Sequence, residues 1–161
     1  MLPSGGREKN PGSAAKAMAN QSMTFRWVAD DLVIVVEHRD TLDDADVDAF
    51  LGAATAHLVG PTGIRILVYS AGGGPNAAQR ARFDRQLRGK PVRIAVICTS
   101  AFTRVIIKGF HLLGFLQVAP FAPDQEEAAF RHLSLKAPEI TLVRTELAKI
   151  RVIQSQSAVG V

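Results

Sequence analysis

Residues 64–121 decide the fold, and they read IRILVYSAGGGPNAAQRARFDRQLRGKPVRIAVICTSAFTRVIIKGFHLLGFLQVAPF. Three short apolar runs in this stretch alternate with two segments of helical periodicity. The runs are 64–68, 92–97 and 115–119, and the helical segments are 76–88 and 101–113. Apolar strands without polar alternation, separated by helices, are typical of a parallel sheet covered on both faces. The stretch therefore predicts an α/β domain.

Shorter elements are expected on either side of this stretch. Two β-branched and aromatic runs, 24–28 and 32–36, are separated by three residues and predict an antiparallel hairpin. A helix is expected from Thr41, a good N-cap, to Leu58. Two further helices are expected at 123–133 and 138–150. We therefore predict a mixed sheet that opens with a hairpin and continues with parallel strands.

The domain organisation follows from length and composition. A chain of 161 residues with 47% apolar positions fits one globular domain, expected over 23–135. Residues 1–22 are rich in Gly, Ser, Ala, Asn and Pro, which predicts a disordered tail, although a start at Met23 is an alternative interpretation. An additional amphipathic helix is expected over 136–153, followed by a frayed end at 154–161.

Several classes of protein are disfavoured by composition. No apolar run reaches the roughly 20 residues that a membrane-spanning helix needs, and the first residues lack the pattern of a secretory signal. The single cysteine, Cys98, allows no internal disulfide and favours a reducing compartment. The histidines are not placed at metal-binding spacing. We expect a cytoplasmic protein without a metal or another cofactor.

The charge is unevenly distributed. Eight basic residues and one aspartate lie between Arg80 and Lys108, so this segment carries +7 and the remainder −3 of a net charge of +4. Aromatic platforms for bases are scarce there, with Phe83 the nearest, so we expect no nucleic acid partner. A solvated basic face is one interpretation. An acidic protein partner is the functional interpretation that we prefer over an anionic headgroup.

The order of elements resembles the sulfate transporter and anti-sigma factor antagonist (STAS) family. The residues that carry the resemblance are VRIAVI at 92–97 with AFTRVI at 101–106, then VAPF at 118–121 with DQEEA at 124–128. These pairs are similar to the second half of STAS-like bacterial proteins, and the resemblance covers about residues 24–135. It implies a non-enzymatic role in signal transduction, in which the domain binds a partner protein.

The resemblance also implies a phosphorylated Ser or Thr at the start of the helix after the third strand. Added charge at a helix start would alter both docking and dipole balance. This chain has Asn76, Ala77 and Ala78 at the corresponding positions, so the phosphorylatable serine is missing. Ser70, at the strand end, is either a switch or a loop hydroxyl that bonds the backbone.

A glycine-rich loop follows the third strand. Gly72, Gly73 and Gly74 permit close approach of a partner because they lack a Cβ atom, but the same loop is equally a plain connector. The loop lacks the Gly-Lys-Ser/Thr end of a P-loop and the Gly-x-Gly-x-x-Gly spacing. Nucleotide binding is therefore disfavoured.

A Cys-x5-Arg run from Cys98 to Arg104 is the main rival signal. Thiol phosphatases use this spacing to hold phosphate over a thiolate at a helix start. Here the loop contains Ala101 and Phe102 where glycines are expected, and no histidine precedes Cys98. We prefer Cys98 as a small buried residue, with Ser100 capping the helix.

The leading hypothesis is a STAS-like, non-catalytic regulatory domain that binds another protein. The alternatives are a phosphatase-like thiol enzyme and a binding module for a small anionic or lipid ligand held over the strand ends. The apolar stripe of 138–150 either covers the sheet of its own subunit or joins a second subunit in a homodimer. The candidate contact residues are Ser70, Gly72, Gly73, Gly74, Pro75, Asn76, Arg80, Arg85 and Arg104.

Overall fold

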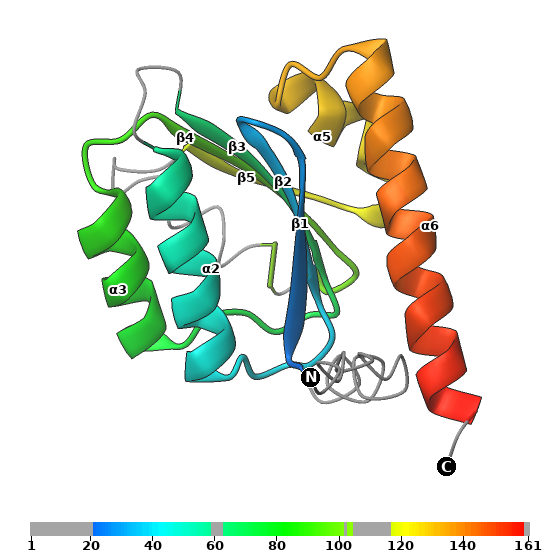
Figure 1. Ribbon diagram of the computed structural model, residues 1–161, viewed down its shortest axis with the longest axis horizontal. Helices are drawn as coiled ribbons and strands as arrows, with labels where there is room; N and C mark the ends of the chain where they lie inside the picture. The colour runs from blue at the N-terminus through cyan, green and yellow to red at the C-terminus, as the bar shows by residue number, and fades with distance from the viewer. Residues whose placement is uncertain (1–20, 59–62, 102, 105–116, 160–161) are drawn as a thin grey trace, which may run out of the picture.

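The computed structural model describes residues 21–58, 63–101, 103–104 and 117–159, and these form one sheet with helices on both faces (Figure 1). The strands are β1 Met23–Ala29, β2 Leu32–Glu37, β3 Ile64–Ser70, β4 Val92–Cys98 and β5 Gln117–Phe121. The helices are α2 Asp44–His57, α3 Ala77–Leu87, the short 3-10 helix η1 Pro123–Gln125, α5 Glu126–His132 and α6 Ala137–Val159.

The sheet has five strands in the order β1-β2-β3-β4-β5. β1 and β2 are antiparallel, and every later pair is parallel. The predicted α/β architecture, a hairpin followed by parallel strands and covering helices, is therefore confirmed. Because the central strands run in the same direction, their carboxyl ends meet at one edge of the sheet.

Helices cover both faces of the sheet, as the uniformly apolar strands require. α2 and α3 lie on one face, and α5 and α6 lie on the other (Figure 1). The core beneath α2 and α3 contains Val33, Val35, Leu42, Val47, Phe50, Leu51, Ile64, Ile66, Leu87 and Val92. The opposite core contains Leu32, Ile34, Leu67, Ala95, Ile97, Phe130, Leu133, Val143 and Leu147.

α6 covers the sheet of its own subunit. Val143, Leu147 and Ile150 are buried, and the first two belong to the core under α5 and α6. This settles the use of the apolar stripe, which the sequence left open. The helix also extends to Val159, so residues 154–159, which the sequence predicts to fray, are helical. Once a helix is formed, each further residue adds a hydrogen bond without repeating the cost of nucleation, and the next glycine comes only at position 160.

Other boundaries differ from the sequence prediction. The strand expected over 115–119 is β5, which ends at Phe121 instead, while 115 and 116 lie outside the described residues. β5 lies at the sheet edge, where the missing N–H of Pro120 is tolerated. Of the helix expected over 101–113, Ala101, Thr103 and Arg104 are helical, and the rest lies outside the described residues.

Ser22, which the sequence assigns to the disordered tail, is tied to the domain. Ser22 is fully buried, and its backbone N–H and hydroxyl both donate to Asp46 Oδ2, at 2.7 and 2.6 Å. Its hydroxyl also accepts the N–H of Asp43 at 2.8 Å. These partners lie more than twenty residues away along the chain, so local composition gives no sign of them.

Candidate functional site

The loops after β3 and β4 lie side by side at the carboxyl edge of the sheet. Ser70 and Cys98, the last residues of these strands, are register partners. Thr103 Oγ1 donates to the Gly72 carbonyl at 2.6 Å, and a Cβ added to Gly72 would lie 3.6 Å from Ser100 Cβ. We call residues 70–76 together with 98–101, 103 and 104 the rim.

The glycines of the rim are required by contacts within the chain. Gly72 and Gly74 have φ values of 126° and 154°, which side chains disfavour. Gly73 packs so closely on the β2–α2 connection that an added Cβ would lie 1.9 Å from the Asp40 carbonyl oxygen. Thr41 and Gly74 form an isolated parallel bridge. The loop is therefore held against its neighbour, and the glycines by themselves are no sign of a partner.

Ser70 holds the start of this loop. It is 8% exposed, and its hydroxyl accepts the Gly72 N–H at 3.2 Å while donating to the Gly73 carbonyl at 3.4 Å. The geometry matches the interpretation of Ser70 as a hydroxyl that bonds the backbone. A phosphate on Ser70 would remove the proton that the hydroxyl donates to the Gly73 carbonyl.

The loop ends in the cap of α3. Asn76 accepts the Gln79 N–H, and Gln79 Oε1 accepts the Asn76 N–H, each at 2.9 Å, which is a capping box. Pro75 lies between the glycines and this cap, and its carbonyl accepts from Arg80 Nη1 at 3.1 Å. The loop of the rim therefore leads directly into the first turn of α3.

The face of α3 that packs inward carries Gln79 together with Phe83 and Leu87. Ala77 and Ala81 are exposed, whereas Gln79 is 1% exposed. The Gln79 amide donates to the Leu42 carbonyl at 2.8 Å and to Asp44 Oδ1 at 2.9 Å, so its burial leaves no donor unpaired. Sequence reasoning missed Gln79, although the Asn-x-x-Gln spacing is the signal of a capping box.

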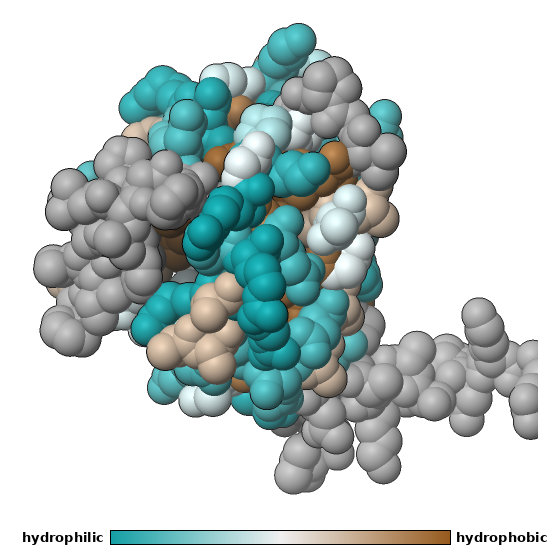
Figure 2. Space-filling model, turned by 90° about the vertical axis from the view of Figure 1, so that its left-hand side faces the viewer, coloured by the Kyte–Doolittle hydropathy of each residue, from teal (hydrophilic) through white to brown (hydrophobic). Residues whose placement is uncertain are grey.

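The basic side of α3 is partly neutralised within the molecule. Arg82 is paired with Asp44 at 2.5 Å and with Asp48 at 2.8 Å, both on α2. Arg80 and Arg85 are exposed. Figure 2 shows the molecule from the side on which α3 and α2 lie, and much of the described surface there is hydrophilic.

Arg104 turns back onto its own loop. Its Nη1 donates to the carbonyl oxygens of Cys98 and Thr99, at 2.8 and 3.1 Å. Ser100 Oγ accepts the N–H of Thr103 at 3.2 Å, as expected for a cap. The structure therefore brings Arg104 to the rim but uses its guanidinium group to close the loop.

A buried carboxyl group that the sequence analysis missed lies beside the rim. Glu37 ends β2 on the same sheet face as Ser70 and Cys98, because side chains alternate along each strand. Its Oε2 is buried and has no hydrogen-bond partner among the described residues. Burial raises the pKa of Glu37, and the Ser70 hydroxyl partly offsets this rise. The signal was the continuation of the inward series Val33 and Val35 to position 37.

Comparisons of the chain with known proteins identified no related protein. A scan against protein-family models, a search of curated proteins and a search of solved structures found no match to the chain. Within the described residues, no group of three or more His, Cys, Asp or Glu side chains is placed to hold a metal ion. None of the described helices has the length and apolar character needed to cross a membrane.

Proposed function

We propose that this chain is a non-catalytic regulatory domain that binds another protein through the rim and the exposed side of α3. The supporting observation is the convergence of the loops after β3 and β4, shown by the contact of Thr103 with the Gly72 carbonyl. In open α/β sheets, binding groups gather at the carboxyl ends of the strands. The resemblance to STAS anti-sigma factor antagonists points to the same role.

The proposed partner presents an acidic surface. Arg80, in the first turn of α3 next to the rim, and Arg85, in its last turn, are both exposed, and Arg82 is paired with Asp44 and Asp48. Complementary charge mainly steers association and fixes orientation. Control by a phosphorylated serine is not part of this proposal, because the helix start offers Asn76, Ala77 and Ala78 and the Ser70 hydroxyl is committed to the loop.

The geometry of Cys98 favours this proposal over a thiol phosphatase. A catalytic thiolate needs a lowered pKa and access to substrate. Cys98 is 1% exposed, and burial raises its pKa although Arg104 opposes the rise. The guanidinium group that would hold phosphate instead bonds two loop carbonyls. If the parent chain hydrolyses an aryl phosphate and Cys98→Ser does not, the non-catalytic proposal is wrong.

The test of partner binding is affinity capture from the native cytoplasm, where we place the protein. The variant carries Arg80→Glu with Arg85→Glu. The control, Arg26→Glu with Arg151→Glu, has the same charge change on β1 and α6, where both residues are exposed. We expect a partner that the parent and the control retain and the rim variant loses. Identical partners for all three chains would contradict the proposal.

A further inference from the structure

We propose that Glu37 is a proton-sensitive switch beneath the rim: when its carboxyl group ionises, the Ser70 hydroxyl turns from the Gly73 carbonyl to Glu37, and the loop relaxes. The biological meaning of this switch rests on the proposed function, since the rim is the proposed binding surface. The switch itself is a property of the free chain.

The first support is the alignment of three polar side chains across the sheet. Val36 and Tyr69 are register partners, so the next residues, Glu37 and Ser70, are neighbours across β2 and β3. Ser70 is in turn the partner of Cys98 on β4. Because side chains alternate along each strand, all three lie on the face of the sheet that carries Val35, Ile66 and Val92, which α2 and α3 cover.

The second support is a mismatch in hydrogen bonding. The Ser70 hydroxyl can donate one hydrogen bond. It donates this bond to the Gly73 carbonyl at 3.4 Å, which is near the upper distance limit for a hydrogen bond. Glu37 Oε2, meanwhile, is a buried oxygen without a partner among the described residues. A carboxylate is a stronger acceptor than a carbonyl group. The ionised carboxylate of Glu37 would therefore replace the Gly73 carbonyl as the acceptor of the hydrogen bond from the Ser70 hydroxyl.

The surroundings keep Glu37 protonated at acidic pH and allow it to ionise later. Burial raises its pKa above the ordinary value, and the hydrogen bond that the Ser70 hydroxyl can give to the ionised carboxylate lowers it. Among the described residues, the titratable group that interacts with Glu37 is the Cys98 thiol of β4, which in turn feels Arg104. His38 contacts Thr24 on β1 and Gln154 on α6 instead.

Rotation of the Ser70 hydroxyl toward Glu37 would change the hydrogen bonds of the rim. The Gly72 N–H can stay on Ser70 Oγ, but the Gly73 carbonyl loses its donor. Gly73 packs on Asp40, and the loop leads straight into the cap at Asn76. The protonated form has the loop geometry described above, and the ionised form has a loosened rim.

The test is a nuclear magnetic resonance titration of the free, full chain between pH 4 and 9. We expect the amide signals of Gly72 and Gly73 and the Gly73 carbonyl carbon to shift with one midpoint, which lies above the ordinary glutamate value of about 4.3. The Glu37 carboxyl carbon should show the same midpoint. A flat response of the glycines, or a midpoint different from that of Glu37, would overturn the proposal.

Three variants show which side chains cause the transition in the glycine signals. Glu37→Gln should abolish the glycine transition, and Ser70→Ala should abolish it while Glu37 still titrates. Cys98→Ser should keep it, which separates the carboxyl group from the thiol. Persistence of the transition in Glu37→Gln, or its loss in Cys98→Ser alone, would contradict the switch. The parent titration remains decisive if Ser70→Ala fails to fold, and none of these outcomes affects the partner-capture result.

Discussion

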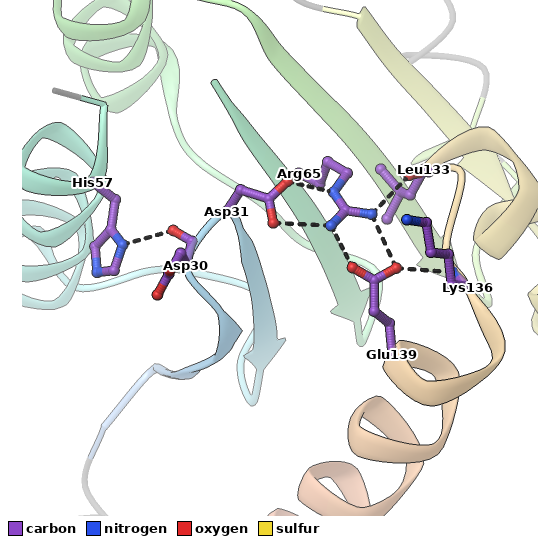
Figure 3. Close-up of polar contacts among 7 residues, drawn as sticks. All are labelled: Asp30, Asp31, His57, Arg65, Leu133, Lys136 and Glu139. Atoms are coloured by element: carbon purple, nitrogen blue, oxygen red, sulfur yellow. Dashed lines mark hydrogen bonds and ion pairs between the residues drawn. The ribbon is translucent and has the colours of Figure 1, made fainter. Parts of the chain in front are cut away.

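Arg65 of β3 and Glu139 of α6 form a two-point ion pair, with Nη2 to Oε1 at 2.6 Å and Nη1 to Oε2 at 3.3 Å (Figure 3). The same guanidinium group donates to both carboxylate oxygens of Asp31, in the turn between β1 and β2, at 2.9 Å each. It also reaches the Leu133 carbonyl at 3.4 Å. One side chain thus ties the hairpin, the sheet and the start of α6 together.

Removal of Glu139 should loosen α6. Glu139→Ala deletes the pair with Arg65 and the contact of Oε2 with the Lys136 N–H at 2.8 Å. The pair is half-buried, so we expect a loss of roughly 1–3 kcal/mol in unfolding free energy, between the values of exposed and buried pairs. Urea unfolding of the parent and the variant measures this loss. Glu146→Ala, which breaks the more exposed pair with Lys149, is the control and should lose less than about 0.5 kcal/mol.

The ion pair also predicts a loss of stability in acid. Hydrogen bonds from Arg65 lower the pKa of Glu139 in the folded chain. Its contribution is therefore complete above the unfolded-state value of about 4.3 and disappears as the pH falls through the folded-state pKa. Thermal unfolding of the parent should show a steeper fall below pH 4.5 than Glu139→Gln. Parallel curves for the two chains would contradict this assignment.

Glu37 should change the pH dependence of stability in the opposite direction. Because burial raises its pKa, the protonated form stabilises the fold at low pH, and this contribution is lost as the pH rises through the folded-state pKa. Glu37→Gln carries no charge to bury, so its melting temperature should exceed that of the parent at pH 8. The difference should vanish near pH 4. A variant that is less stable than the parent at pH 8 would contradict this assignment and would show that Glu37 forms a stabilising contact as a carboxylate.

Gln79 should matter more than its polarity suggests. Gln79→Leu leaves the Leu42 carbonyl and the Asn76 N–H without their partners. The Leu42 carbonyl is buried, and an unpaired buried group destabilises a protein by about 1–3 kcal/mol, whereas the partly buried Asn76 N–H should lose less. Gln86→Leu, on the same helix but exposed, is the matched control and should change the unfolding free energy by less than about 0.5 kcal/mol. Equal effects would refute the role of Gln79.

The course of the chain through the sheet was predictable because it depends on strong local patterns. The apolar runs around Ile66 and Ile94 lack alternation and are separated by a helical segment, which demands parallel strands under two layers. Convergence of the loops near Gly72 and Ser100 follows from that topology alone. The predicted order, hairpin first, therefore matched the structure.

The details of the rim were not predictable because they depend on partners distant in sequence. Gly73 is fixed by Asp40, and Gln79 is buried because Leu42 and Asp44 accept its protons. Arg65 meets Glu139 across 74 positions of the chain. Such pairings leave no periodic signal. The burial of the polar Gln79 therefore could not be predicted from the apolar pattern of its helix.

Site-specific photo-crosslinking tests the central claim most directly. A photoreactive residue replaces Ala78, exposed on α3 beside the rim, or Ala148, which is also exposed but lies on α6. Irradiation in native cells should yield a defined adduct with a partner protein from position 78 and none from position 148. Adducts from position 148 alone, or from neither position, would contradict a binding surface at the rim.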